Sequence, residues 1–413
     1  SHLRKRMLKD RSGIWVKGVL TQFLVGTLFC AAQAKVLIPF KDGFKYGYMD
    51  LEKNVVLQAS FERTFILKEG MGRFKYRDAY GFVDRNGKIV IKNLFLEAWD
   101  FKEGLARIRE GVRCGFIDKT GKQVIKVIGE DCTDFHNGMA IFKRQHKYGY
   151  INKKGEEIFE PVLSKAEPFE NGMARIHIGS LYGLINEKGE YILAPVFDFI
   201  GVGQDNYIRA KRQGLWFIYD KQGRQIAKTS YALIEDFGNQ RVAYRKYNTD
   251  MVEWRGYLDQ NGEEVIEAQY SWVGPFREGL AVVKDDDLFG VIGSDGSFVV
   301  EPEYENTRGS FVEGRLGVER NGQWGFIDQR GNLTVRPKYA RVENYFRGHA
   351  MVSQGFLRWG AINKEGKLVV PMKFEVVMVE EDFLVAIIGQ LRAFYTFDGK
   401  LIHQEELPKV DGE

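Results

Sequence analysis

The amino-acid sequence repeats itself from residue 44 onward. The best-preserved copies have an aromatic residue or Cys, then Gly, an aromatic residue, an aliphatic residue, Asp or Asn, and a second Gly three positions later, as at residues 80–87, 114–121, 148–155 and 324–331. The copies begin near residues 47, 81, 115, 149, 183, 217, 256, 290, 325, 360 and 393. A nearly constant spacing of roughly 34 residues indicates a repeat architecture rather than a series of unrelated domains.

Each repeat predicts three short β-strands. In the second copy the first strand covers residues 80–84, the second covers 87–91 after a turn, and the third covers 105–108 after a Phe-x-x-Gly segment. These runs are rich in β-branched and aromatic residues and end at turn residues, which is typical of strands. No segment has a sustained apolar period of 3.6 residues. The sequence therefore predicts an all-β tandem-repeat protein.

Glycine accounts for 46 of the 413 residues, and the repeat gives many of them a backbone role. Gly87 and its equivalents close the turn between the first two strands, where a four-residue turn that starts with Asp or Asn favours a final Gly with positive φ. Gly81 and its equivalents lie inside the first strand, and Gly104 and its equivalents precede the third. A glycine inside a strand indicates a bulge or a close backbone approach, so we expect neighbouring units to pack tightly at Gly81.

Two architectures can accommodate eleven such units. Three strands in so short a unit predict an open, twisted or superhelical β-array. Propeller blades normally hold four strands in 40 or more residues, so a closed β-propeller is the alternative. We expect the repeat domain over residues 35–404 and a polar C-terminal tail over 405–413.

Residues 1–34 have the layout of a secretory signal peptide. Basic residues precede an apolar stretch at 19–32, and Ala-Gln-Ala at 32–34 is a small-residue cleavage site. The apolar stretch is shorter than the roughly 20 residues that span a bilayer. We take Met7 as the start of translation, with residues 1–6 upstream of it. We expect export to the periplasm, the cell surface or the medium, without a transmembrane span after cleavage; an uncleaved anchor is the alternative.

Loss of this segment changes the net charge of the chain. The segment holds six of the 60 Lys and Arg and one of the 56 Asp and Glu, so the charge falls from +4 to −1. A nearly neutral protein gives no support to nucleic-acid binding as a property of the whole chain. We therefore expect no nucleic-acid partner.

Two copies begin with the dipeptide Trp-Gly. Residues 324–328 read Trp-Gly-Phe-Ile-Asp and residues 359–363 read Trp-Gly-Ala-Ile-Asn. In tandem units of this spacing, the motif resembles the bacterial WG-repeat (WG/KWG β-repeat) family over roughly residues 44–404. Several copies carry Tyr in place of Trp, and Phe217 replaces the Gly after Trp216. The resemblance implies export to the bacterial envelope and a non-catalytic scaffold role, and it supplies no catalytic residue.

The sequence contains no motif for catalysis or cofactor binding. No histidine pair has metal-ligand spacing, and no nucleophile elbow, Walker loop or dinucleotide fingerprint occurs between a strand and a helix. We expect the Asp-x-x-Gly turns to bond their own backbone rather than calcium, and the acidic run at 285–287 to be a solvated loop rather than a cation site. We therefore predict no enzyme, no cofactor and no metal; the alternative is an envelope glycan-processing enzyme whose carboxylates come from several repeats.

The cysteines and tryptophans occupy repeat positions that point inward. Cys114 takes the place of the first-strand aromatic residue, and Cys132 takes the place that Ala98 and Ala166 hold in other copies. In an exported protein they are a possible disulfide, and two buried thiols are the alternative. Core packing is favoured over a carbohydrate-stacking ladder for the tryptophans at 99, 216, 254, 272, 324 and 359.

The loops that join the third strand of one unit to the first strand of the next should lie on one edge of a stacked array. In the middle units this edge is basic, and its cations are Arg109, Arg113, Lys143, Arg144, Lys147, Lys211, Arg212, Arg245, Lys246 and Arg255. The longest unit has an insertion around residues 247–254 on the same edge, and such insertions often map to a binding face. We predict an exported binding or scaffolding protein that contacts an envelope protein or an anionic envelope polymer through this edge; ordinary solvated loops are the alternative.

Overall fold

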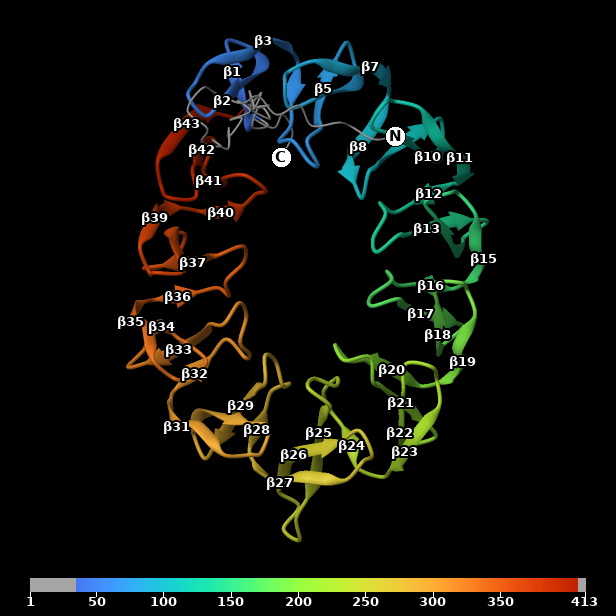
Figure 1. The fold of residues 1–413 in the computed structure, drawn as a ribbon, viewed down its shortest axis with the longest axis vertical. Helices are drawn as coiled ribbons and strands as arrows, with labels where there is room; N and C mark the ends of the chain where they lie inside the picture. The colour runs from blue at the N-terminus through green and yellow to red at the C-terminus, as the bar shows by residue number, and fades with distance from the viewer. Residues whose placement is uncertain (1–34, 408–413) are drawn as a thin grey trace, which may run out of the picture. The chain divides into compact units, whose positions relative to one another are not determined.

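The computed structural model describes residues 35–407, so the predicted leader at 1–34 and most of the predicted tail lie outside the described residues. Within residues 35–407 the chain forms 43 β-strands. None of these residues belongs to a helix with the length and hydrophobicity needed to cross a membrane. The strands form eleven antiparallel sheets that follow one another in chain order (Figure 1). We call each sheet a blade and number the blades from 1 to 11 along the chain.

The strand bounds show the same pattern in successive blades. Blade 1 holds β1 (Leu37–Asp42), β2 (Lys45–Asp50) and β3 (Val55–Phe61); blade 2 holds β4 (Arg63–Thr64), β5 (Gly72–Tyr76), β6 (Ala79–Val83) and β7 (Ile89–Phe95); blade 3 holds β8 (Glu97–Lys102), β9 (Leu105–Glu110), β10 (Arg113–Asp118) and β11 (Gln123–Gly129); blade 4 holds β12 (Asp131–Cys132), β13 (Met139–Arg144), β14 (Lys147–Asn152) and β15 (Glu157–Leu163); blade 5 holds β16 (Lys165–Ala166), β17 (Met173–Ile178), β18 (Leu181–Asn186) and β19 (Tyr191–Phe197); blade 6 holds β20 (Phe199–Val202), β21 (Ile208–Arg212), β22 (Leu215–Tyr219) and β23 (Gln225–Thr229).

The second half of the chain continues this order. Blade 7 holds β24 (Ala232–Leu233), β25 (Arg241–Tyr247), β26 (Glu253–Asp259) and β27 (Glu264–Tyr270); blade 8 holds β28 (Trp272–Val273), β29 (Leu280–Asp285), β30 (Leu288–Gly293) and β31 (Phe298–Tyr304); blade 9 holds β32 (Asn306–Thr307), β33 (Leu316–Arg320), β34 (Gln323–Ile327) and β35 (Leu333–Tyr339); blade 10 holds β36 (Arg341–Val342), β37 (His349–Ser353), β38 (Trp359–Asn363) and β39 (Leu368–Phe374); blade 11 holds β40 (Val376–Val379), β41 (Leu384–Ile388), β42 (Leu391–Tyr395) and β43 (Leu401–Glu406). The repeat domain therefore extends two residues past the predicted boundary at 404.

Blades 2 to 11 have four strands each, which we call a, b, c and d in chain order. The predicted first and second strands of a unit are strands c and d, and the predicted third strand is strand b of the next blade. The residues before the Phe-x-x-Gly segment, which the sequence assigned to a loop, form strand a. Two paired residues are enough, as in β4 and β12. The predicted open array of three-stranded units is not found, and the structure shows the alternative, a closed β-propeller.

Blade 1 closes the ring against blade 11. Strand β43 packs against β1 as β39 packs against β41, so the closing contact is of the same kind as the contact between consecutive blades. Ile38 and Met49 of blade 1 share a buried cluster with Phe383 and Phe394 of blade 11. Within the described residues blade 1 lacks strand a. Closure therefore rests on side-by-side packing and not on a strand shared between the two ends of the described chain.

The turns of blades 2 and 11 meet directly beside this three-stranded blade. Lys68 pairs with Glu380, and the Arg85 guanidinium lies 2.9 Å from a carboxylate oxygen of Asp382. Both partners in blade 11 come from its a–b turn, and both partners in blade 2 come from its own turns. Ion pairs thus span the place where the first blade has no strand a.

Carboxylates in the a–b turns link consecutive blades. Glu103 of blade 3 accepts a hydrogen bond of 2.8 Å from the backbone N–H of Gly138 in blade 4, and lies 3.1 Å from the Lys153 ammonium of that blade. Three other glutamates make the same two contacts with the next blade, one to a glycine N–H and one to a side chain of the c–d turn. They are Glu313 with Gly348 and Lys364, Glu69 with Gly104 and Lys119, and Glu278 with Gly314 and Gln329. In these blades one carboxylate therefore holds the next blade at both of its turns.

Buried or half-buried arginines in strand b add a second link in the first half of the ring. The Arg107 guanidinium donates a hydrogen bond of 2.8 Å to the Cys132 carbonyl in strand a of the next blade and forms an ion pair of 3.0 Å with Asp134. Arg209 repeats this with the Leu233 carbonyl and Asp236. Arg73 and Arg175 donate to the Ala98 and Ile200 carbonyls in the same way. These links were not predicted from the sequence, although the spacing of 24 or 25 residues between arginine and acceptor recurs.

The close approach predicted at Gly81 occurs within one blade. The pairing of β6 with β7 shifts register on both sides of Phe82, and a Cβ at Gly81 would lie 2.5 Å from the Ile91 carbonyl oxygen of the adjacent strand. A Cβ there would also lie 2.6 Å from the Phe74 ring, which belongs to strand b of this blade and to the preceding unit of the sequence repeat. The predicted close packing of neighbouring units at this glycine is therefore found inside one blade. The bulge leaves no room for a side chain.

We expect Gly81→Ala to destabilise the protein by about 3 kcal/mol, because the added methyl group overlaps a backbone carbonyl that the sheet holds in place. Chemical denaturation followed by tryptophan fluorescence measures the loss. Gly111→Ala is the matched control, because Gly111 has φ +62° and open space around it. Its cost should be only about 1 kcal/mol, from the left-handed backbone alone. Equal costs for the two variants would contradict the steric explanation.

The turn carboxylates predict an acid-sensitive ring. Partial burial favours the neutral form of Glu103 and Glu313, but the glycine N–H and the lysine of the next blade outweigh it and lower the pKa of both carboxyls. A lowered pKa contributes stability at neutral pH that is lost as the pH falls through that pKa. The double variant Glu103→Gln, Glu313→Gln should therefore be less stable at neutral pH, by about 1 kcal/mol per site. Thermal unfolding from about pH 7 to pH 3 should show the difference vanishing in acid, and a constant difference would contradict this origin.

Candidate interaction face

The hairpins that join strands b and c lie on one face of the ring. In blade 4, the corner residue Glu130, which precedes strand a, donates its N–H to the Lys143 carbonyl near the hairpin tip, at 2.9 Å. The Glu130 carboxylate accepts a hydrogen bond of 3.0 Å from the backbone N–H of Gln145 at the tip. Hairpin tips and d–a corners therefore share an edge of each sheet. We call this edge the hairpin face, and we call the opposite edge, which holds the a–b and c–d turns, the turn face.

Corner carboxylates hold several tips in a left-handed backbone conformation. Gln145 has φ +50°, which costs energy for a residue with a side chain, and its N–H is fixed by Glu130. The same bond joins Glu62 to Arg77, Asp198 to Gln213 and Glu305 to Asn321. The hairpin face is thus built from braced tips, so the side chains next to each tip have a defined position.

All ten predicted cations lie in strands b or c near a tip, on the hairpin face of blades 3, 4, 6 and 7. Half of them are paired with carboxylates. The pairs are Arg109 with Glu97 at 3.2 Å, Arg144 with Glu157 at 2.6 Å, Arg245 with Glu253 at 3.2 Å, Lys246 with Glu264 at 3.0 Å, and Arg255 with Glu253. Glu97 comes from strand a, and Glu157 and Glu264 come from strand d of the same blade as their partners. These pairs leave less free positive charge on this edge than the loop sequences predict.

The other five cations have no carboxylate within ion-pair distance among residues 35–407. They are Arg113, Lys143, Lys147, Lys211 and Arg212. Lys143 and Lys211 lie over the rings of Tyr148 and Trp216, with 5.6 and 5.9 Å from nitrogen to centroid. Arg113, Lys147 and Arg212 are exposed. The positive charge of the face is therefore concentrated at the tips of blades 3, 4 and 6.

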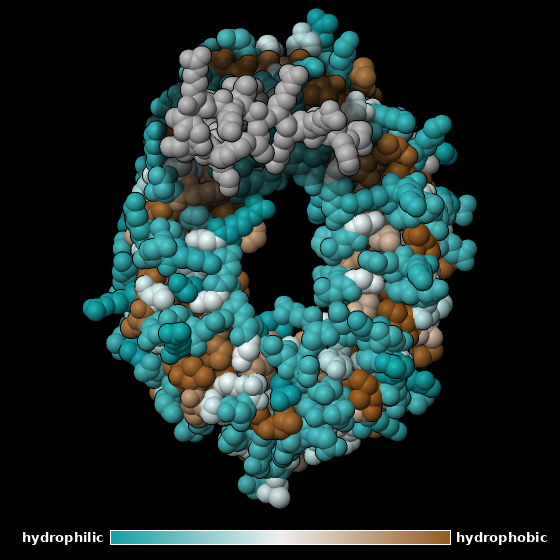
Figure 2. Space-filling model, in the orientation of Figure 1, coloured by the Kyte–Doolittle hydropathy of each residue, from teal (hydrophilic) through white to brown (hydrophobic). Residues whose placement is uncertain are grey.

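Apolar side chains occupy the tips between and beside these cations. Val112 in blade 3 and Met251 in blade 7 are each 76% exposed, and Ile178 and Leu181 flank the tip of blade 5. From blade 3 to blade 7, exposed apolar residues lie at the tips of blades 3, 5 and 7, and cations without a carboxylate partner lie at the tips of blades 3, 4 and 6. Figure 2 shows that exposed hydrophobic residues form small, separate patches on a mostly hydrophilic surface. Exposed apolar residues that are scattered singly are ordinary on a protein surface; on this face they lie at the same tips as the unpaired cations or at tips next to them.

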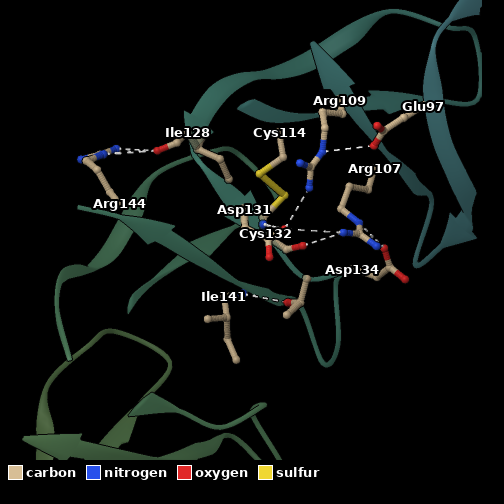
Figure 3. Close-up of a disulfide and its surroundings, with 11 residues drawn as sticks. Glu97, Arg107, Arg109, Cys114, Ile128, Asp131, Cys132, Asp134, Ile141 and Arg144 are labelled. Carbon is tan, nitrogen blue, oxygen red and sulfur yellow. Dashed lines mark hydrogen bonds and ion pairs between the residues drawn. A yellow bond between two sulfur atoms is a disulfide. The ribbon is translucent and has the colours of Figure 1, made fainter. Parts of the chain in front are cut away.

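A pocket of about 430 Å³ opens between blades 3 and 4 on this face. It is lined by Arg113, Ile128, Gly129, Glu130, Arg144 and Gln145. The Arg144 guanidinium donates a hydrogen bond of 2.8 Å to the Ile128 carbonyl (Figure 3). It also forms an ion pair with Glu157, so it already has two protein partners. Arg113 is the remaining cation at the mouth of this pocket.

A disulfide crosses the same pair of blades. The sulfur atoms of Cys114 in β10 and Cys132 in β12 are bonded, and the Cα atoms lie 6.2 Å apart (Figure 3), within the usual range for a disulfide. Both cysteines are buried among Phe116 and Phe135, whose rings pack edge to face at 4.8 Å. The bond therefore ties blade 3 covalently to blade 4 beneath the basic tips.

The described residues contain no cluster of His, Cys, Asp or Glu arranged to hold a metal ion. The acidic run at 285–287 forms the hairpin tip of blade 8. In the Asp-x-x-Gly turns the aspartate bonds its own backbone, as where Asp84 accepts the N–H groups of Asn86 and Lys88 at 2.8 and 3.0 Å. These turns match the prediction that they are structural.

Three carboxyls of the described residues have a raised pKa, Asp100 in blade 3 and Glu235 and Glu264 in blade 7; burial is the main cause at Glu264. Burial raises the pKa of Asp100 in blade 3, against the nearby Arg73 guanidinium. Burial also raises the pKa of Glu235 in blade 7, where Arg209 opposes the shift. Glycoside hydrolysis needs two carboxyls within roughly 10 Å of each other, and Asp100 lies in a blade that is not a neighbour of blade 7. The surroundings of Asp100 and Glu235 are those of structural contacts between blades.

Comparison with known proteins supports the repeat assignment. A family model described as WG containing repeat matches residues 46–78, 80–111, 115–146, 148–181, 182–216, 256–289, 289–324, 324–355 and 359–387. No curated protein matches the sequence. Similar solved structures include Hsv2p of Kluyveromyces lactis, with 13% identity, a TM-score of 0.34, and coverage of 58% of this chain and 96% of that chain. BamB of Moraxella catarrhalis has 9% identity, a TM-score of 0.32, and coverage of 78% and 99%. These two structures are too distant to support a conclusion about function.

The disulfide predicts that the native protein has no reactive thiol at Cys114 or Cys132, before or after denaturation without reductant. A thiol reagent followed by mass spectrometry of the two tryptic peptides measures this. Reduction should destabilise the protein by about 3 kcal/mol, because the bond closes a loop of 18 residues. The double variant Cys114→Ala, Cys132→Ala controls for unrelated effects of the reductant. Labelling of both cysteines after denaturation alone would show that the bond is absent.

Proposed function

Because this chain belongs to the family of WG-repeat proteins, we propose that it is an exported, non-catalytic binding protein that docks an acidic partner on the hairpin face of blades 3 to 7. The partner is an envelope protein or an anionic envelope polymer. The observation that carries this proposal is that the tips of blades 3, 4 and 6 carry cations without a carboxylate partner and the tips of blades 3, 5 and 7 carry exposed apolar side chains, along one continuous arc of the ring. Cations without a carboxylate partner supply long-range attraction, and the exposed apolar tips supply area that a partner can bury.

The rigidity of the face supports a binding role. Each tip is part of a four-stranded blade packed between two others; turn carboxylates link several of these blades, and a disulfide also joins blades 3 and 4. A preorganised surface loses little conformational freedom on binding, so more of the contact energy appears as affinity. The spacing between successive tips is therefore a fixed property that a partner with repeating charge can match.

Export is supported by two independent features. The predicted leader has the order of charged, apolar and small residues of a secretory signal. The buried disulfide is a kind of bond that persists mainly outside the cytosol. Together they support a periplasmic or extracellular location, where acidic polymers and proteins are the available partners.

A charge-reversal test of this proposal should use cations that have no carboxylate partner in the structure. Arg144 is bound to Glu157 and to a backbone carbonyl, so its reversal would disturb the fold. We choose Arg113→Glu, Lys147→Glu, Lys211→Glu and Arg212→Glu, all on the hairpin face. The combined variant should bind poly-L-glutamate at least tenfold more weakly than the natural chain, and salt should weaken the binding of the natural chain. Retention on an immobilised polymer and pull-down from envelope extract measure both classes of partner.

A matched control reverses four lysines in the c–d turns of the opposite face. The control set is Lys88→Glu, Lys122→Glu, Lys188→Glu and Lys221→Glu, which changes the net charge by the same amount. It should leave most of the binding intact. If the two quadruple variants bind equally well, overall charge and not the hairpin face determines binding, and the proposal fails.

A further inference from the structure

A second pocket on the hairpin face lies between blades 9 and 10, away from the cations of blades 3 to 7. Its volume is about 420 Å³, within the usual range for small-molecule sites. Trp324 lines it from strand c of blade 9, and Trp359 lines it from strand c of blade 10. The two indoles occupy the same repeat position in consecutive units, so the propeller brings them to the two sides of one opening.

Three other tryptophans of the ring have partners for their indoles. Trp99 lies 3.8 Å from the Arg107 guanidinium, and Trp216 and Trp272 each pack against a phenylalanine ring at 5.7 Å. Trp324 and Trp359, in contrast, have neither a cation nor another aromatic ring over them among residues 35–407, although each is partly buried against a core cluster. The prediction that the tryptophans serve core packing therefore holds only in part for these two. Each indole packs against a core cluster and also lines the pocket.

The polar lining of the pocket is balanced in charge. Arg308 pairs with Glu343, and Arg341, Glu319 and Asn306 complete the polar wall. Two guanidinium groups accompany two carboxylates, so the pocket has no excess charge with which to hold a phosphate or a free amine. Each of these side chains is planar and presents more than one hydrogen-bonding atom. This set suits a neutral ligand with many hydroxyl groups.

We propose that this pocket binds a neutral saccharide unit. The apolar C–H face of a sugar ring would lie on an indole, where it buries apolar area and meets the electron-rich face of the ring. Its hydroxyls would bond to Arg341, Glu319 and Asn306. The pocket is separate from the cations of blades 3 to 7, so saccharide binding can be tested independently of the docking of an acidic partner.

The test titrates the disulfide-intact protein with three neutral trisaccharides, tri-N-acetylchitotriose, cellotriose and maltotriose. At least one should change the tryptophan emission in a saturable way, and Trp324→Leu and Trp359→Leu should each weaken its binding at least tenfold. Trp99→Leu is the control, because that indole lies in blade 3, and it should bind as the natural chain does. Inorganic phosphate should produce no saturable change.

A second pair of variants guards against misfolding. Arg341 is exposed and Glu319 is half-buried, so Arg341→Gln and Glu319→Gln should fold normally, and together they should weaken binding severalfold. The proposal is overturned if none of the three trisaccharides binds at about 10 mM, a concentration above the weakest affinity expected of a specific site. It is also overturned if binding survives both tryptophan substitutions, or if phosphate binds and the sugars do not.

Discussion

Each hydrophobic cluster of the ring is shared between neighbouring blades. Phe82 and Ile91 of blade 2 pack with Phe101 and Ile108 of blade 3, and the last cluster joins blade 11 to blade 1. A single blade is a small twisted sheet that cannot bury its own apolar faces, so its stability comes from the two blades beside it. The hairpins, the pockets and the disulfide all depend on this lateral packing, because it sets the distance and angle between one blade and the next.

Polar contacts then determine the alignment of the packed blades. Glu103 and its equivalents act at the turns, and Arg107 and its equivalents act in strand b. Apolar contacts are tolerant of sliding, whereas a hydrogen bond to a specific carbonyl or N–H is not. The result is a surface whose cations and indoles have fixed spacing although they come from separate repeats. Sites in such a ring arise between blades, as both pockets on the hairpin face do.

The repeat itself, the all-β class and the turn glycines could be predicted from the sequence, because they depend on local patterns that recur in many copies. Strand a could not, because two residues such as Asp131 and Cys132 are too short to show an alternating pattern, and this omission favoured an open array over a propeller. The position of the ten cations was predictable from loop order. Their pairing was not, because Glu157 and Glu264 reach them from strand d, two strands away in the same blade. The difference between Trp216 and Trp324 likewise depends on which neighbours the next blade presents.

The three-stranded first blade has a consequence for how such proteins change over time. Every blade is a continuous stretch of chain, and the described ends of the ring meet by packing rather than by exchanging a strand. Recombination between two copies of the repeat in a gene would therefore add or remove one whole blade without rethreading the rest. The new ring would need only a small change of angle at each interface to close again. The number of repeat copies therefore sets the size of the ring in this architecture. A pair of blades with a ligand site between them can be kept when the ring gains or loses other blades.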